Sequence, residues 1–215
     1  YLYTAEHSED SPYYPGALLR CVDAYTGKEL WTVPFAGVSN SMAIADGYLI
    51  GLNLYDMQIY CFGKGQTATT VSAPNTAIPL GTPILVQGTV TDQSPGVTQT
   101  KKLSPNSLGT PAISDADQGA WMAYTYMQKP IPETATGVPV TIFATDPSGH
   151  TQEIGKVTSD MSGTYAISWT PPSTGIYTIT ATFDGTNNYF NSYTATCILV
   201  TPAPAIVSPE PTTSP

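Results

Sequence analysis

Short segments of alternating hydrophobic and polar residues fill the second half of the chain, and they constrain its fold more than any other feature. A strand with this alternation buries one face and exposes the other. Turn-forming stretches such as DPSG, SDMSG, PPSTG and DGTNN separate several of these segments. Short strands at this spacing predict an all-β sandwich. The segments, in chain order from residue 83, are PILVQGTVTD, PVTIFATD, QEIGKVTSD, TYAISWTPP, GIYTITATFDG and TATCILVTP.

A long insertion separates the first two of these segments, and it contains a predicted helix. Residues 114–129, SDADQGAWMAYTYMQK, have the pattern of a short helix. Ser114 is suited to cap its first turn, and Asp115 and Asp117 suit its positive N-terminal end. Pro130 is expected to stop it.

Aromatic residues line this predicted helix on two adjacent faces. Trp121 and Tyr124 share one face, and Met122 and Tyr126 share the next. They predict either a plug that seals the open end of the sandwich or a platform for a carbohydrate or a partner, and the plug is the commoner use of such residues. Tyr177 is a second predicted anchor: it follows a glycine at a strand start and resembles the tyrosine corner of immunoglobulin-like folds.

The first 65 residues also predict short strands joined by turns, arranged as two partial copies of one repeat. The first copy contains YLYTAEH, ALLRCVDA and ELWTVPF, and the second contains SMAIADGYLIGLNL and QIYCFGKG. Aligning the copies places Leu19-Arg20-Cys21 on Ile59-Tyr60-Cys61. Cys21 and Cys61 are therefore forty residues apart, which is the spacing of a four-stranded propeller blade.

The first copy resembles a blade of the quinoprotein-like (PQQ-like) propeller family. Asp23, Ala24, Thr26, Gly27 and Trp31 match that family's repeat. The resemblance implies that the tryptophan packs between blades and that Thr-Gly forms the hairpin turn, so both are structural. It also implies that the chain carries about one and a half blades, beginning inside the penultimate one.

The order of segments as a whole resembles the C-terminal part of large exported archaeal proteins. In those proteins a quinoprotein-like propeller precedes an immunoglobulin-like domain, a Pro/Thr stalk and a membrane anchor, and the family brings no defined activity. We therefore expect an all-β chain with a partial β-propeller over residues 1–65, a polar linker over residues 66–82 and an immunoglobulin-like β-sandwich. The sandwich domain is assigned to residues 66–202, with its helical insertion at about 114–129. Residues 203–215 are expected to form a Pro-rich stalk.

The low content of charged residues and the negative net charge limit the classes of partner that the chain is expected to bind. Only 11% of the residues are charged, and the net charge is −9. This balance repels nucleic-acid phosphates and anionic membrane surfaces, so neither is an expected partner. No apolar run approaches the length that spans a bilayer. Because the chain opens on a tyrosine without a signal peptide, we interpret it as a mature or trimmed piece of something longer. Its Thr- and Tyr-rich, Lys-poor composition suits strands exposed outside a cell.

The residues that carry chemistry in other proteins are sparse here. Quinone chemistry needs groups from several blades, so no cofactor is expected. The two histidines, His7 and His150, lie in different predicted domains without ligands at metal-binding spacing. Three Asp-containing turns invite a calcium interpretation, but Asp-x-Ser-Gly is also what a turn needs on backbone grounds. No Gly-x-Ser-x-Gly elbow presents a serine nucleophile.

The three cysteines, Cys21, Cys61 and Cys197, have no metal-binding spacing, and we expect small buried side chains that do not pair. The structural candidates are therefore Asp23, Thr26, Gly27, Trp31, Trp121 and Tyr177, with no catalytic, cofactor-binding or metal-binding residue.

The function expected from these features is that of a non-enzymatic structural or assembly protein of a cell surface, such as a component of an S-layer, sheath or filament. Its expected partners are other copies of itself or neighbouring surface-protein chains, which would cover the Pro-rich tail or complete the last blade. Two alternatives stay open: a surface module that recognises a glycan or peptide, and the non-catalytic tail of a membrane-anchored enzyme.

Overall fold

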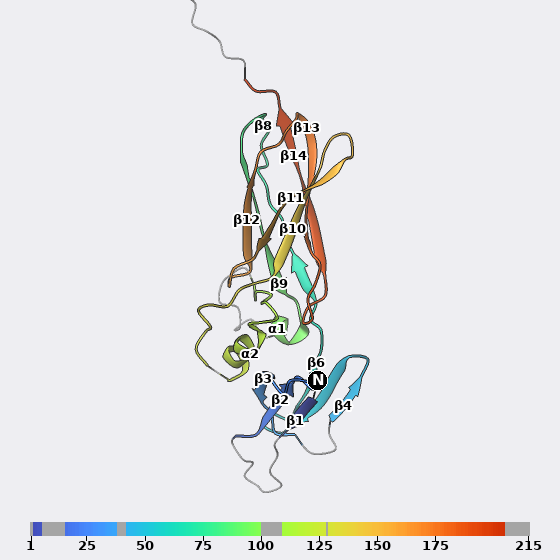
Figure 1. The fold of residues 1–215 in the computed structure, drawn as a ribbon, viewed down its shortest axis with the longest axis vertical. Coiled ribbons are helices and arrows are strands. Elements are labelled where there is room, and N and C mark those ends of the chain that lie inside the picture. The colour runs from blue at the N-terminus through green and yellow to red at the C-terminus, as the bar shows by residue number, and fades with distance from the viewer. Residues whose placement is uncertain (1, 6–15, 38–41, 100–108, 128, 205–215) are drawn as a thin grey trace, which may run out of the picture.

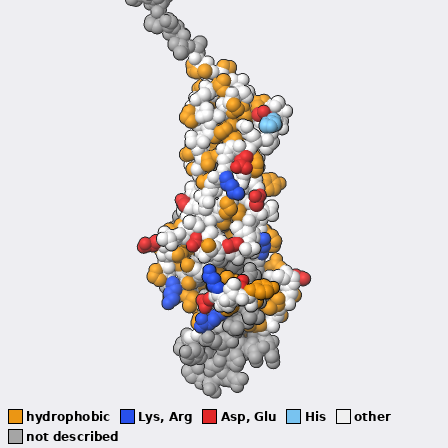
Figure 2. Space-filling view, viewed as in Figure 1, with side chains coloured by type: hydrophobic (Ala, Val, Ile, Leu, Met, Phe, Trp, Pro, Cys, Tyr) orange, Lys and Arg blue, Asp and Glu red, His pale blue; other side chains and the backbone are white. Residues whose placement is uncertain are grey.

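The chain forms an elongated all-β body with two parts (Figure 1). The computed structural model describes residues 2–5, 16–37, 42–99, 109–127 and 129–204. A larger pair of sheets occupies one end, two small sheets occupy the other, and two short helices lie between them. Charged side chains are sparse over the visible surface, where hydrophobic and uncharged groups alternate (Figure 2).

Eight strands make up the larger part. They are β7 (Thr67–Thr69), β8 (Ile78–Pro79), β9 (Ile84–Asp92), β10 (Pro139–Thr145), β11 (Thr151–Thr158), β12 (Thr164–Trp169), β13 (Gly175–Phe183) and β14 (Ser192–Thr201). One sheet has the order β11-β10-β13-β14-β8, and the other has the order β12-β9-β7. All pairings are antiparallel except that of β8 with β14.

The two sheets share one hydrophobic core. Val86 comes from the three-stranded sheet, and Val140 and Ile179 come from the five-stranded sheet; all three are fully buried in the same cluster. Burial alternates along β13 as the sequence predicts for a half-buried strand. The larger part is thus a β-sandwich, and its arrangement is consistent with the immunoglobulin-like fold expected from the sequence.

Tyr177 anchors one end of this core. Its side chain is fully buried on β13, and its ring meets the Trp169 ring edge-on at 5.4 Å between centroids. The Ser173 backbone N–H donates to the Tyr177 hydroxyl at 3.2 Å, and the two hydroxyls lie 2.6 Å apart. A hydroxyl that binds backbone a few residues upstream is the geometry of a tyrosine corner.

The predicted linker over residues 66–82 is wrong in one respect, because it contains two strands of the sandwich. β7 pairs with β9, and β8 pairs in parallel with the end of β14. The Thr67 hydroxyl donates to the Phe190 carbonyl at 2.8 Å, which ties the segment to the loop before β14. Pro79 is tolerated because β8 is an edge strand.

The described residues of the insertion form the helices α1 (Pro95–Gln99) and α2 (Gln118–Met127). α2 begins later than the predicted start, because residues 114–117 form a turn in which the Ser114 hydroxyl donates to the Asp117 carboxylate at 2.7 Å. The Asp117 carbonyl accepts the first helical bond, from the Trp121 N–H. Asp115 accepts from the Asn187 N–H at 3.0 Å, so this acidic residue fastens the insertion to the loop between β13 and β14. Within the described ranges no helix is long and apolar enough to cross a membrane.

Six strands make up the smaller part, close to the segments predicted. They are β1 (Leu2–Ala5), β2 (Leu18–Val22), β3 (Glu29–Pro34), β4 (Met42–Ala45), β5 (Tyr48–Asn53) and β6 (Gln58–Phe62). They form two separate sheets, β1-β2-β3 and β4-β5-β6. Cys21 pairs with Tyr3 and Cys61 pairs with Ile50, so the cysteines occupy equivalent places in the two copies. Two three-stranded sheets do not make a propeller, and the propeller assignment stays a prediction.

The two small sheets pack face to face through aromatic side chains. Trp31 on β3 stacks on Phe62 of β6, with ring centroids 5.3 Å apart and planes 21° apart. Phe35 is fully buried beside them and lies against Gly51, where an added Cβ would meet the Phe35 ring at 2.9 Å. Trp31 therefore lies between the two small sheets.

The DAYTG stretch, residues 23–27, forms the turn between β2 and β3 and is held by its own side chains. The Asp23 carboxylate accepts from the Thr26 N–H at 2.8 Å and from the Thr26 hydroxyl at 2.9 Å. These bonds hold the pKa of Asp23 below its usual value. Gly27 has φ 71°, a left-handed conformation that glycine adopts without strain.

Gly119 lets α2 lie directly on β3, which joins the insertion to the small sheets. A Cβ at this position would collide with the Leu30 carbonyl oxygen. We expect Gly119→Ala to lower the free energy of unfolding by about 1–2 kcal/mol, because the helix must move away from β3. Gly96→Ala in α1 is the matched control, since a Cβ there meets nothing within 4 Å. Urea unfolding of both variants checks this, and equal midpoints would contradict it.

Candidate functional site

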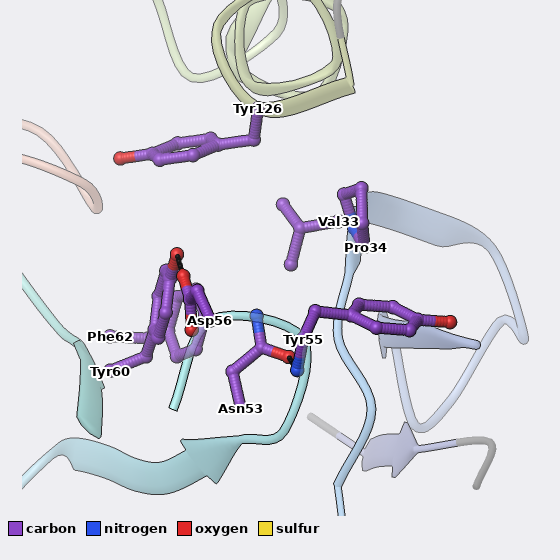
Figure 3. Close-up of a pocket in the computed structure, with 8 residues that line it drawn as sticks. All are labelled: Val33, Pro34, Asn53, Tyr55, Asp56, Tyr60, Phe62 and Tyr126. Carbon is purple, nitrogen blue, oxygen red and sulfur yellow. Dashed lines mark hydrogen bonds between the residues drawn. The ribbon is translucent and has the colours of Figure 1, made fainter. Parts of the chain in front are cut away.

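A pocket of about 190 Å³ lies where the small sheets meet α2 (Figure 3). We call it the aromatic pocket. The residues that line it come from β3, from β5 and the turn that follows it, from β6 and from α2. They are Val33, Pro34, Asn53, Tyr55, Asp56, Tyr60, Phe62 and Tyr126.

Three aromatic rings face the open space of this pocket. Tyr60 and Phe62 stand side by side on β6, with centroids 6.0 Å apart and planes 23° apart. Tyr126 projects from α2 across the space from them (Figure 3). Val33 and Pro34 close another side. The rings thus come from segments more than sixty residues apart in the sequence.

One carboxylate lies at the rim of the aromatic pocket. Asp56 accepts from the Tyr60 hydroxyl at 2.7 Å and from the Gln58 N–H at 3.1 Å. Burial, together with the bond to Asp56, raises the pKa of Tyr60 to about 12. The phenol therefore stays protonated at neutral pH and keeps donating to Asp56, which fixes the ring and the carboxylate together.

The other polar residues of the pocket, Asn53 and Tyr55, accept hydrogen bonds from the protein backbone. Asn53 is buried, and its side-chain oxygen accepts from the Ala36 N–H at 3.0 Å and the Tyr55 N–H at 3.2 Å. The Tyr55 ring points away from the other aromatics, and its hydroxyl accepts from the Ala17 N–H at 2.8 Å. These bonds fasten β5 and the turn after it to the segments that flank β2 and β3.

A second notable surface is the face of β4-β5-β6 that points away from β1-β2-β3. Directly paired residues of antiparallel strands share a face, so the register identifies its members. None of them is charged, and several are exposed although they are apolar: Ile59 is 74% exposed and Ile50 is 43% exposed. We call it the outer face; it consists of Ala43, Ala45, Tyr48, Ile50, Leu52, Ile59 and Cys61.

Two of the three turns that invited a calcium interpretation use a carboxylate oxygen of their aspartate internally. Asp146 accepts from the Ser148 N–H and hydroxyl and from the His150 N–H. Asp160 has the same pattern in the next turn. Among the residues that the structure describes, no cluster of three or more His, Cys, Asp or Glu side chains could hold a metal ion. His7 and its acidic neighbours lie outside the described residues.

The cysteines form no disulfide with one another, but the expectation that all three are buried is wrong. Cys21 is buried, whereas Cys61 and Cys197 are exposed. Cys61 lies on the outer face, and Cys197 lies on the side of β14 that points away from the core.

The predicted structural residues do not converge on one site. Asp23, Thr26 and Gly27 lie in one turn, and Tyr177 lies in the sandwich. Trp121 is buried under α2 and contacts the Tyr124 ring at 5.3 Å between centroids.

Tyr126 is instead the helix residue that reaches the pocket. The sequence marked it as aromatic but offered no signal that would pair it with β5 and β6.

Comparison with known proteins assigns no family to this chain. No family model matches it, and no curated protein matches it. Among solved structures it is similar to the CARDB domain of a protein from Pyrococcus furiosus, which was crystallised in complex with di-metal ions. The two are 13% identical, and the match covers 65% of this chain and 91% of that domain with a TM-score of 0.33. A likeness at this level carries no argument about function.

Proposed function

We propose that this chain is a structural assembly module of an extracellular cell surface, and that it binds a second copy of itself through the outer face. Its low charge and its Thr- and Tyr-rich strands support an extracellular setting. The observation that carries the proposal is the exposure of an uncharged, apolar sheet face.

Comparison of the two copies of the repeat supports the proposal that another chain covers the outer face. Leu19 and Cys21 on the first small sheet are 0% and 2% exposed, and Leu19 shares a hydrophobic cluster with Leu49 of the second small sheet. Ile59 and Cys61 occupy the equivalent places on the second sheet, yet both are exposed. Similar side chains thus pack against another sheet in one copy and face solvent in the other, as expected of a contact surface.

Charge favours a second copy meeting the chain at this face. Two chains with a net charge of −9 repel each other wherever their acidic residues approach. The outer face holds no charged side chain, so two copies can meet there without burying a charge. Apolar association at that face offsets the remaining long-range repulsion.

Placing a lysine on the outer face should break this association. We expect Ile59→Lys to raise the dissociation constant of the dimer at least tenfold, because the dimer would bury an unpaired charge. Analytical ultracentrifugation over a concentration series measures the change. Ile176→Lys on β13 is the matched control, because Ile176 is 62% exposed but lies on the sandwich.

Thiol labelling gives an independent measurement on the unmodified protein. Cys61 should become protected from a maleimide as the protein concentration rises, whereas Cys197, exposed on β14, should react at the same rate throughout. A wild-type protein that stays monomeric at every concentration, with Cys61 always reactive, would refute the proposal.

A further inference from the structure

We propose that the aromatic pocket is a binding site for an alkylammonium group, that is, a small organic cation with methyl or methylene groups on its nitrogen. This site is separate from the outer face: Tyr60 and Phe62 point to the opposite side of the β4-β5-β6 sheet from Ile59 and Cys61. The inference therefore does not depend on the assembly proposed above.

The arrangement of the rings is the first argument. The rings of Tyr60 and Tyr126 border one small space from two sides. Phe62 lines the space beside Tyr60, with one of its faces stacked on Trp31. Aromatic faces attract cations through their quadrupole, and an alkylated ammonium group also gains from contact with the apolar ring surface. Val33 and Pro34 add apolar walls that suit the methyl groups.

The charge around the pocket is the second argument. Asp56 is exposed at the rim, with its carboxylate already oriented by the Tyr60 hydroxyl. The eight lining residues include no lysine, arginine or histidine that would neutralise it. Asp92 lies close enough to Tyr126 that its charge adds to burial in raising the pKa of that phenol. A cation in the pocket would lie in this negative field.

The size and the polar groups argue against other ligand classes. A volume of about 190 Å³ is below the roughly 300–1,000 Å³ of drug-sized sites, so the pocket fits a head group rather than a large molecule. An anion would find no basic partner. A sugar needs several hydrogen-bond acceptors and donors, but the Asn53 side-chain oxygen and the Tyr55 hydroxyl already accept from backbone N–H groups.

Titration with choline and with its neutral tert-butyl analogue tests the charge requirement. The two compounds have the same shape, so a difference between them isolates the positive charge. We expect saturable chemical-shift changes at Tyr60, Phe62 and Tyr126 with choline, and at least tenfold weaker binding of the neutral analogue. A peptide that carries trimethyllysine, in a parallel titration, distinguishes an ammonium group on a protein from one on a free small molecule.

Two variants test the residues. Tyr126→Leu removes one ring from a half-exposed helix position, and Asp56→Asn removes the charge while keeping the shape. Each should weaken choline binding about fivefold or more. Tyr193→Leu is the matched control, because Tyr193 is 72% exposed on β14 and does not line the pocket.

The proposal is overturned by any of three results: no saturable binding of choline or of the peptide, equal binding of the neutral analogue, or an equal loss in the Tyr193→Leu control. Since none of these measurements depends on association between copies, their failure leaves the assembly proposal intact.

Discussion

Replacing Tyr177 with alanine is expected to lower the free energy of unfolding by about 3–5 kcal/mol, the cost of removing a large aromatic side chain from a packed core. Tyr177 is fully buried, its ring contacts Trp169, and its hydroxyl binds Ser173 at the end of the sandwich. Removing it leaves a cavity between the two sheets and frees the loop before β13. Chemical denaturation followed by far-ultraviolet circular dichroism measures the loss.

Two further variants separate the ring from its hydroxyl. Tyr177→Phe keeps the ring and loses only the bonds to Ser173, so it should cost about 1 kcal/mol. Tyr193→Ala, on the exposed side of β14, should leave stability nearly unchanged. If Tyr177→Ala were as mild as Tyr193→Ala, the tyrosine would not anchor the core.

Long alternating strands were predictable from the sequence, and short ones were not. β13 shows the alternation directly, because every second residue faces the core. β7 and β8 have only three and two residues, too few for a period of two to be visible. Their positions are set by pairing with β9 and β14. Because these partners lie further along the chain, the pairing leaves no signal in the local sequence.

The start of α2 was mispredicted for a related reason. Ser114 and Asp117 have the composition of a helix cap, but they bond to each other and to Thr136 in a turn before the helix. Those bonds hold the pKa of Asp117 below its usual value. Local propensity cannot reveal that a residue nineteen positions away competes for the same carboxylate.

The aromatic pocket could not be predicted from the sequence, because it depends on tertiary contacts. Tyr126 meets Tyr60 and Phe62 only because α2 lies on β3, and that contact depends on the missing side chain of Gly119. A glycine inside a helical pattern looks unfavourable on propensity alone. The reason for a glycine at position 119 is visible only in the folded structure, where β3 lies against it.

Trp31→Ala is expected to destabilise the small sheets by about 3 kcal/mol, at the low end for a tryptophan because the side chain is only partly buried. Trp31 stacks on Phe62 and lies where α2 crosses β3, so its loss removes packing between the two small sheets and loosens the pocket. The hydrophobic cluster of the small sheets and that of the sandwich share no residue. Hydrogen exchange measured by mass spectrometry should therefore show lost protection across β2 to β6 and little change across β10 to β14.

The control for this loss is Tyr25→Ala, because Tyr25 is fully exposed in the adjoining β2–β3 turn. It should leave exchange in both parts of the chain unchanged. The sandwich strands and the small sheets have separate hydrophobic clusters, and near the chain crossing they are joined by backbone contacts such as the Gly65 N–H donating to the Asn188 carbonyl at 2.8 Å. Contacts of this kind transmit less stability than a shared apolar core. If Trp31→Ala instead removed protection equally from β10 to β14, the two parts would unfold as one unit, and the small sheets would belong to the sandwich.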